Sequence, residues 1–330
     1  MRAVVYTQFG FPDVLQLREV ERPVPRAREV LIRVHAASLN FSDPAFTAGR
    51  PFAVRLMGAG LLKPKNRILG ADIAGRVEAV GAGARQFRPG DAVFGDISEC
   101  GWGGFAEYVC AREDALAAKP ANASFEEAAA APQAAVTALQ GLRDKGGIQS
   151  GQKVLIVGAS GGVGSFAVQI AKAFGAEVTG VCGTGNLEMV RSLGADCVID
   201  YTREDFAAAG PLYDLILAIK GYRSLSDYRR ALNPGGVYVM VGGSGSQLLE
   251  AMLLGPWVSM TGDKRMGNLA SRPSQKDLGV VRELMEAGKV RPVIDRRYAL
   301  GQVAEAVRYY QEGHARGKVV ISVASPEGGA

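Results

Sequence analysis

The chain has 330 residues, of which 48% are hydrophobic and 22% charged, and its formal net charge is +5. This length and composition are typical of a globular enzyme with two sizeable cores. No apolar run of about 18 residues predicts a membrane span, no signal-peptide-like stretch precedes the first strand, and the scattered basic residues argue against a nucleic-acid site. We therefore expect a cytoplasmic protein.

The first 120 residues or so show short β-type runs separated by Gly, Pro and Asp. Such spacing predicts a compact, β-barrel-like domain. The predicted strands are residues 1–6, Val30–His35, Gly75–Val80, Ala92–Phe94 and Phe105–Val109.

The pattern changes at Ser124, where Ser124 and Glu127 form a capping box and helical spacing continues through Val136–Leu142. Strand and helix signals then alternate, which predicts a parallel, doubly wound α/β sheet. Its strands are predicted at 153–157, 177–181, 196–199, 213–217, 236–241 and 257–260.

The last part of the chain contains signals for a helix, a strand, a second helix and a final strand. These are expected at Gln275–Ala287, Val293–Tyr298, Gln302–Glu312 and Lys318–Val323. We expect a first domain over residues 1–123, completed by 288–330, and a nucleotide-binding domain over 124–287.

A glycine-rich turn follows the strand at 153–157 and opens directly into a helix. Small residues allow a tight turn and a close approach of the backbone to a ligand, and the helix N-terminus offers free N–H groups. The turn matches the dinucleotide fingerprint with Ala159 in place of the first Gly, and a second strand follows the helix. The predicted pyrophosphate-binding residues are Ser160, Gly161, Gly162, Val163 and Gly164.

The end of the second strand favours NADPH over NADH. An NAD-type site usually has an acidic residue there for the ribose 2′-hydroxyl, but this chain has no acid until Glu188. Gly183, Thr184 and Asn186 form the loop, and Thr184 and Asn186 can donate to a 2′-phosphate. Tyr201, after the third strand, is predicted at the same adenosine end.

A second glycine pair, Gly242–Gly243, follows the fifth predicted strand, at the edge of the sheet where ligands bind in such folds. We include both as cofactor-binding candidates; the alternative is a flexible turn. The four cysteines and two histidines have no spacing suited to zinc, so we predict no metal site.

Several further motifs extend over nearly the whole chain. They are 36–43 (Ala-Ala-Ser-Leu-Asn-Phe-Ser-Asp), 69–81, 88–94, 158–164 and 313–320 (Gly-His-Ala-Arg-Gly-Lys-Val-Val). With these, the chain resembles zinc-free members of the medium-chain dehydrogenase/reductase superfamily, close to the zeta-crystallin-like quinone oxidoreductases. The resemblance implies a GroES-like domain, a Rossmann domain and a homodimer.

The resemblance also implies site residues. Asn40 stands where zinc-dependent members have a ligand Cys, and Gly70-Ala71-Asp72 stands in place of Gly-His-Glu. In zinc-free members the Asn-x-x-Asp segment lies beside the nicotinamide, which implies a catalytic role for Asn40; a structural role is favoured for Asp43. Thr137 and Lys318 are implied at the cofactor.

Without a metal, hydride transfer needs an acceptor that is already electrophilic. We therefore expect an NADPH-dependent reductase of quinones or α,β-unsaturated carbonyls. Two alternatives stay open: an enoyl reductase of a larger biosynthetic intermediate, and a non-catalytic NADPH-binding scaffold or redox sensor. Residues 46–67, basic and apolar, are either a substrate lid or a solvated surface helix.

Overall fold

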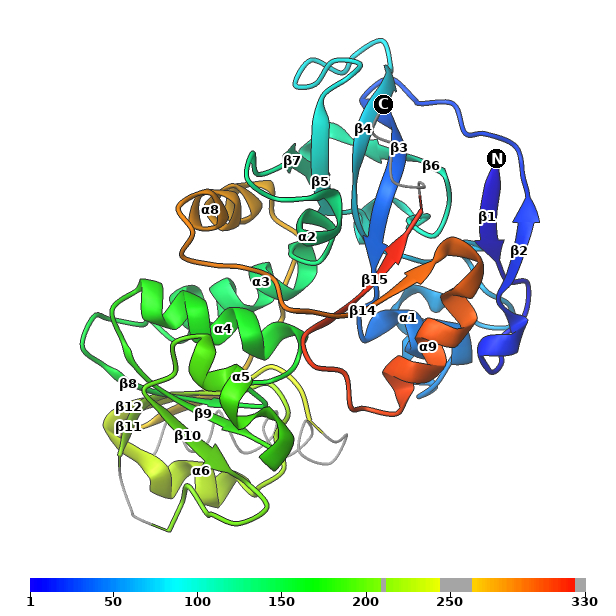
Figure 1. Cartoon of the computed structure of the whole chain (residues 1–330). Helices are drawn as coiled ribbons and strands as arrows, with labels where there is room; N and C mark the ends of the chain where they lie inside the picture. Colours follow the sequence, from blue (N-terminus) through cyan, green and yellow to red (C-terminus); the bar gives the residue numbers. More distant parts are fainter. Residues whose placement is uncertain (209–211, 244–262, 324–330) are drawn as a thin grey trace. The chain divides into compact units, whose positions relative to one another are not determined.

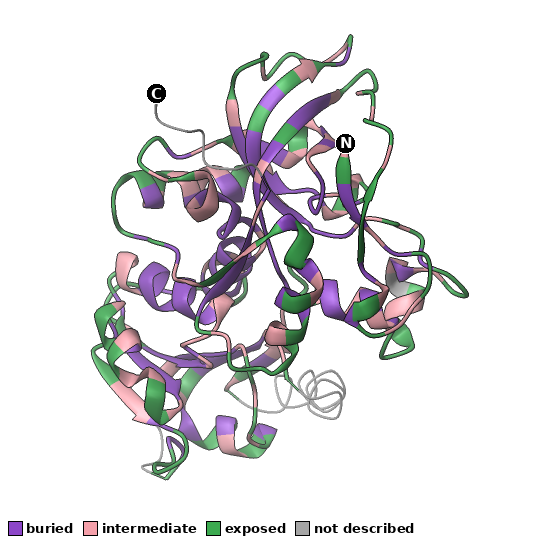
Figure 2. Ribbon diagram, turned by 45° about the vertical axis from the view of Figure 1, so that its right-hand side comes forward, coloured by how far each residue is buried: buried purple, intermediate pink, exposed green. Residues whose placement is uncertain are grey.

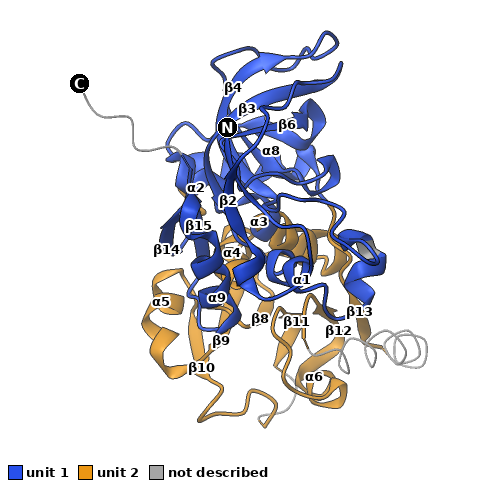
Figure 3. Ribbon diagram, turned by 90° about the vertical axis from the view of Figure 1, so that its right-hand side faces the viewer, with its two compact units in different colours: residues 1–134, 273–287, 292–330 blue, residues 135–272, 288–291 orange. Residues whose placement is uncertain are grey.

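The computed structural model describes residues 1–208, 212–243 and 263–323. The chain divides into two compact units, coloured separately in Figure 3. Unit 1 comprises 1–134, 273–287 and 292–330, and unit 2 comprises 135–272 and 288–291. The predicted boundaries at 124 and 287 differ from this division, because 124–134 and 273–287 pack with the strands of unit 1.

Unit 1 is built on a seven-stranded sheet with the order β14-β15-β3-β4-β5-β7, in which β6 also pairs with β3. The last strand of the chain, β15, runs antiparallel to β3, with Val320 opposite Ser38. The C-terminal segment therefore completes this unit, as the family resemblance implied. The strands are β3 (Glu29–Ser38), β4 (Asp72–Val80), β5 (Ala92–Asp96), β6 (Tyr108–Arg112), β7 (Leu116–Ala118), β14 (Ile294–Ala299) and β15 (Lys318–Ser322), beside a two-stranded sheet of β1 (Arg2–Val5) and β2 (Gln16–Glu19).

Short helices surround these strands. The predicted capping box opens α2, where Ser124 accepts a hydrogen bond from the Glu127 backbone N–H. Gln275, the first residue of α8, donates to the carbonyl of Leu116 in β7 at 2.7 Å, which ties α8 to unit 1. The helices are α1 (Ser42–Ala48), α2 (Phe125–Ala129), α8 (Gln275–Glu286) and α9 (Val303–Gln311), with a π-helical turn at Arg55–Ala59.

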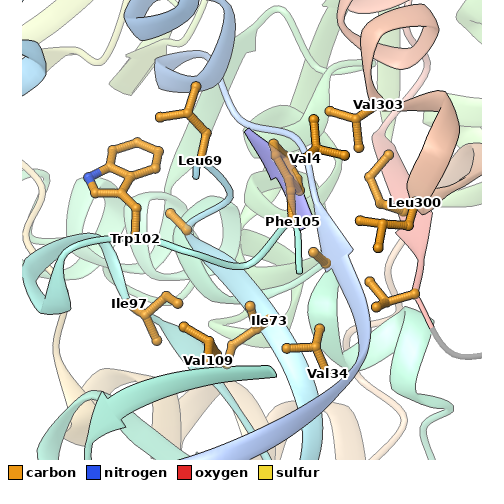
Figure 4. Close-up of a cluster of buried hydrophobic side chains, with 14 of the residues drawn as sticks. Val4, Val34, Leu69, Ile73, Ile97, Trp102, Phe105, Val109, Leu300 and Val303 are labelled. Carbon is orange, nitrogen blue, oxygen red and sulfur yellow. The ribbon is translucent and has the colours of Figure 1, made fainter. Parts of the chain in front are cut away.

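The core of unit 1 lies where the inward faces of these strands meet α9. Figure 4 shows Val4, Val34, Ile73 and Phe105 pointing toward one another, with Leu300 and Val303 packed against them from the C-terminal segment. The buried ribbon in Figure 2 follows the same strands. Burial of this apolar surface provides the main driving force for folding of the unit.

Unit 2 contains a six-stranded sheet with the order β10-β9-β8-β11-β12-β13, all parallel. The strand order reverses between β8 and β11, so this is the doubly wound Rossmann arrangement that the alternating pattern predicted. Figure 1 shows α4 and α5 beside the sheet. The elements are β8 (Lys153–Val157), β9 (Glu177–Cys182), β10 (Cys197–Asp200), β11 (Tyr213–Ala218), β12 (Leu232–Met240), β13 (Arg265–Asn268), α4 (Gly162–Ala173), α5 (Leu187–Ser192) and α6 (Leu225–Ala231).

Some elements differ from the prediction. The strand expected at Phe105–Val109 begins at Tyr108, and the helix expected over Val136–Leu142 is α3 (Pro132–Leu139) followed by a π-helical turn at Gln140–Lys145. The strand expected at 257–260 lies outside the described residues, whereas β13 was not predicted. None of the helices in the described ranges is long and apolar enough to cross a membrane.

Candidate functional site

The turn after β8 is held at the carboxyl end of the sheet. Gly158 has a φ of 86°, which favours glycine, and the backbone N–H groups of Gly158 and Ala159 both donate to the carbonyl of Val181 in β9. Gly161 then precedes α4, a helix of 12 residues. The first N–H groups of that helix have no partner within the helix itself and are available to an anion.

The glycines of the turn fit a dinucleotide. A Cβ added at Gly164 would lie 2.1 Å from the Gly158 carbonyl oxygen, so only Gly allows α4 to pack this closely on the turn. A Cβ added at Gly161 would meet nothing nearer than that same oxygen at 3.6 Å. The space beside Gly161 is thus open to a ligand. Ser160, Gly161, Gly162, Val163 and Gly164 would hold the pyrophosphate, and a nicotinamide cofactor would supply the hydride.

The predicted adenosine-end residues surround the ends of β9 and β10. Asn186 donates from its side-chain amide to Ser160 Oγ at 3.3 Å, which links the loop to the glycine-rich turn. Tyr201 is 50% exposed and its ring centroid lies 5.4 Å from that of Tyr222. A Cβ added at Gly183 would lie 3.5 Å from the Tyr201 ring, an ordinary contact distance. Four of the predicted residues therefore lie near one another.

Thr184 has a hydrogen-bond acceptor within unit 2. Its hydroxyl donates to the carboxylate of Asp200 at 2.6 Å, and its predicted contact with a 2′-phosphate stays a prediction. Asp200 also accepts from the backbone N–H and the hydroxyl of Thr202, at 3.0 and 2.7 Å. These hydrogen bonds, that from Thr184 first, lower the pKa of Asp200, so this buried group is a carboxylate at neutral pH.

Asp200 was not among the predicted site residues. The prediction considered only the acid that usually ends the second strand, but Asp200 ends the third, β10, and pairs in register with Cys182 at the end of β9. Adjacent parallel strands end at the same edge of a sheet. The sequence offered one signal for Asp200 as a site residue: it directly precedes Tyr201, which was predicted at the adenosine end.

Gly242, Gly243 and Thr137 also belong to unit 2. Gly242 follows β12, and its carbonyl accepts a hydrogen bond from the backbone N–H of Gly221 at 3.1 Å, while Gly243 is exposed. Thr137 is buried in α3 and its hydroxyl donates to Ser271 Oγ at 3.1 Å. The hydrogen bonds that these three residues make within the described ranges do not involve the glycine-rich turn.

A second group of polar side chains is buried in unit 1, around Lys318 at the start of β15. The ammonium of Lys318 donates to Asn40 Oδ1 at 2.5 Å and lies 3.5 Å from Asp72 Oδ2. Asp72 also accepts from the backbone N–H of Gln133 at 3.0 Å and from the hydroxyl of Ser38 at 3.4 Å. Asn40, Asp72 and Lys318 are each at least nine-tenths buried. We call these three residues the Lys318 cluster.

Burial acts in opposite directions on the charged groups of the Lys318 cluster. It raises the pKa of Asp72 and lowers the pKa of Lys318, because both charged forms lose solvation. The attraction between the two charges works against both pKa shifts, because each charged group stabilises the charged form of the other. The ammonium of Lys318 has its partners Asn40 and Asp72 within unit 1, and its place at the cofactor stays a prediction.

Asp43 lies beside the Lys318 cluster and has a structural function in unit 1. Its carboxylate accepts from the backbone N–H of Asn40 at 2.7 Å and from that of Gly70 at 3.1 Å, which joins two separate loops. Burial raises the pKa of Asp43 to about 7, although these two hydrogen bonds lower it. This geometry agrees with the structural role favoured for Asp43 over catalysis.

Comparisons with known proteins agree with this arrangement. Residues 26–121 match the family "Alcohol dehydrogenase GroES-like domain", and residues 193–321 match "Zinc-binding dehydrogenase". The chain is 36% identical to a 2-methylene-furan-3-one reductase of Solanum lycopersicum, covering 97% of this chain and 79% of that protein. It is 34% identical to a chloroplast envelope quinone oxidoreductase homolog of Arabidopsis thaliana, covering 97% and 98%.

The chain belongs to the medium-chain dehydrogenase/reductase superfamily. Within this superfamily it is similar to the quinone oxidoreductases: the solved structure of the quinone oxidoreductase from Coxiella burnetii has a TM-score of 0.86 and 31% identity, covering 98% of this chain and 99% of that one. Membership identifies an oxidoreductase with a nicotinamide cofactor, NADH or NADPH, and a small-molecule substrate. The GroES-like and Rossmann domains implied by the resemblance are confirmed.

Proposed function

We propose that this protein reduces quinones or α,β-unsaturated carbonyl compounds with NADPH, without zinc. The glycine-rich turn of unit 2 supports dinucleotide binding. The relatives carry the names of a quinone oxidoreductase and of a furanone reductase, which supports an electrophilic acceptor. Asn40 contributes to turnover at the reactive end of the cofactor, as the family resemblance implies.

The Lys318 cluster is the observation that carries the zinc-free part of the proposal. The resemblance matches positions 40 and 72 to a ligand Cys and to the Glu of Gly-His-Glu in zinc-dependent members. Here the Lys318 ammonium lies against both residues. A divalent cation at the same place would be repelled by this buried positive charge. No three His, Cys, Asp or Glu side chains gather as a metal site would need, within the described ranges.

Oxidation of NADPH by a panel of acceptors tests the proposal. We expect turnover with quinones, enones or enals, and none with simple aldehydes or ketones, because only the former delocalise the incoming charge. Turnover of simple aldehydes alone would contradict it. Activity confined to large thioester-linked enoyl substrates would favour the enoyl reductase alternative, and NADPH binding without any turnover would favour the scaffold.

Zinc independence has its own measurement. Purified protein should contain no stoichiometric zinc by elemental analysis, and a chelator should leave turnover and Tm unchanged. About one tightly bound zinc ion per chain would contradict this. A homodimer and a cytoplasmic location are proposed from the family resemblance and from the sequence; light scattering of the purified protein tests the first.

A further inference from the structure

One segment of unit 1 is distinctly basic, which differs from the scattered charge expected for the chain as a whole. Between Asp43 and Asp72 there are no acidic residues, but there are five basic ones: Arg50, Arg55, Lys63, Lys65 and Arg67. Their number equals the formal net charge of +5, so the rest of the chain is formally neutral. Four of the five, all except Arg55, are exposed. The segment is therefore a stretch of chain with several exposed cationic side chains and no acidic ones.

The same segment exposes large apolar side chains. Phe52 is 63% exposed, Leu56 68%, Leu61 56% and Leu62 95%. Single exposed apolar residues are ordinary, but several on one short segment mark a surface that contacts something other than water. The neighbouring Phe41, which precedes α1, is 74% exposed as well.

The side chain of Arg55 stabilises the conformation of this segment. Its guanidinium lies 4.4 Å from the centroid of the Phe9 ring and 5.9 Å from that of Phe52. It also donates to the carbonyls of Gly49 and Leu61, at 3.0 and 3.2 Å. One side chain thus holds both ends of 49–61 together, and Phe52 and Leu61 flank it.

A tight turn begins at Gly60, near the end of the part of the segment that Arg55 holds together. Gly60 has a φ of 105°, and a Cβ added there would lie 2.3 Å from the Lys63 carbonyl oxygen. The backbone N–H of Lys65 returns to the Ala59 carbonyl at 2.8 Å. This turn places Leu61 and Leu62 directly before the exposed Lys63 and Lys65. Apolar and cationic groups are therefore fixed beside one another.

We propose that residues 50–67 form a docking surface for an anionic membrane. Leucine and phenylalanine side chains gain free energy by entering the boundary between headgroups and acyl chains, while lysine and arginine are attracted to anionic headgroups. The absence of acidic residues over 44–71 removes the repulsion that such a surface would otherwise meet. Nucleic acid is negatively charged like an anionic membrane, but it has no apolar interior into which Leu61 and Leu62 could insert. The surface goes beyond the proposed reductase and requires no cofactor or acceptor.

Co-sedimentation with vesicles tests the proposal. The full chain should bind vesicles of phosphatidylcholine with phosphatidylserine much more than vesicles of phosphatidylcholine alone, and added salt should weaken binding by screening. The variant L61S/L62S should bind about tenfold more weakly, because the apolar contribution is lost. K63E/K65E should also bind at least about tenfold more weakly, because attraction becomes repulsion.

Matched controls use equivalent changes elsewhere. V24S removes a side chain that is 82% exposed but lies near Glu19, Glu21 and Glu29 in the sequence, and K276E/K289E makes the same charge change at two other exposed lysines. Both should bind like the parent chain. If a variant fails to fold, as judged by circular dichroism, the salt dependence of the parent chain still decides.

Three results would overturn the proposal: no binding of the parent chain to anionic vesicles, equal losses in the controls, or retention on duplex DNA without vesicle binding. If the parent chain does not bind vesicles and L61S/L62S has a raised KM for a soluble quinone, the segment would instead be part of the substrate-binding site. Because the vesicle assay contains neither cofactor nor acceptor, failure of the reductase assignment would leave its result unchanged.

Discussion

At the scale of single residues, the side-chain amide of Asn40 has only one orientation in which it can accept a hydrogen bond from Lys318. The Lys318 ammonium has donors and no acceptor, so the oxygen of Asn40 must face it. The amide nitrogen is therefore turned to the other side. Lys318 in turn is balanced by Asp72, which accepts from Gln133 and Ser38. A buried ion pair thus fixes the orientation of a neutral side chain.

Asn40→Ala should lower kcat and kcat/KM together with a quinone or an enone, by about tenfold or more, if Asn40 hydrogen-bonds mainly in the transition state. The affinity for NADPH should change little, because the pyrophosphate and adenosine residues belong to unit 2. Steady-state kinetics and fluorescence titration with NADPH measure the two effects separately.

The control for this variant is Ser38→Ala, which removes a different hydrogen bond to Asp72 in the same buried region. It should reduce stability by about 1 kcal/mol and leave kcat near the parent value. An unchanged kcat in Asn40→Ala, or equal kinetic losses in both variants, would assign Asn40 to a structural role alone.

Cofactor choice is a second property of single residues. Gly183→Asp introduces a carboxylate beside Tyr201 without a clash, because the new Cβ meets only the Tyr201 ring at 3.5 Å. A 2′-phosphate would be repelled, so the ratio of NADPH to NADH affinity should fall by about tenfold. Gly183→Asn is the uncharged control of the same size. Equal affinities of the parent chain for both cofactors, or equal effects of the two variants, would contradict the predicted NADPH preference.

At the scale of elements, the junction of β8 and α4 decides whether unit 2 can bind a dinucleotide. Two glycines in it have different functions. Gly164 allows the helix to approach the turn, since any Cβ would collide with the Gly158 carbonyl oxygen, whereas Gly161 borders open space. Packing requires a glycine at position 164, whereas Gly161 is proposed to leave room for the pyrophosphate.

This difference predicts that alanine substitutions at the two glycines affect different properties of the protein. Gly164→Ala should lower the free energy of unfolding by about 1–3 kcal/mol, because α4 must shift away from the turn. Gly161→Ala should leave stability within about 0.5 kcal/mol of the parent, since its φ of −83° suits alanine. It should nevertheless weaken NADPH binding by about tenfold, because the methyl group occupies ligand space. Urea unfolding and NADPH titration distinguish them; a stable Gly161→Ala chain with parent affinity would refute the pyrophosphate assignment.

At the scale of the whole molecule, the buried carboxyl groups of unit 1 link its stability to pH. Asp43 interacts electrostatically with Asp72, Lys318, Tyr6 and Tyr310. Burial, and to a smaller extent the Asp43 carboxylate, raises the pKa of Tyr310 to about 12. The pKa of Asp43 itself is raised from 3.8 to about 7. The folded state therefore binds this proton more tightly than the unfolded chain does.

The direction of the pH effect follows. Between about pH 4 and pH 7 the folded chain holds more protons at Asp43 than the unfolded chain, so stability falls as pH rises, by at most about 1.4 kcal/mol per pH unit, and then levels off. Urea unfolding of the parent and of Asp43→Asn across this range measures the difference. The variant should lose this part of the slope. Identical slopes would show that Asp43 titrates normally.

Local sequence signals were enough to predict most strands and helices of both units and the glycine-rich turn of unit 2. Glycine positions, strand runs and the Ser124 capping box are local signals, because backbone sterics and hydrogen bonds between near neighbours produce them. The parallel, doubly wound sheet of unit 2 also follows, since alternating strands and helices have few ways to pack. The local pattern alone therefore predicts Ser160 to Gly164 as the pyrophosphate-binding residues, and this assignment stays a prediction.

The partners of the polar side chains depend on contacts between distant parts of the chain. Lys318 lies 278 positions from Asn40 in the chain, and no local pattern indicates that β15 pairs with β3 and brings them together. Asp200 was missed for a related reason, because its partner Thr184 belongs to the neighbouring strand–loop unit. Burial and strand pairing at long sequence separation set these contacts, and both arise only when the chain has closed its cores.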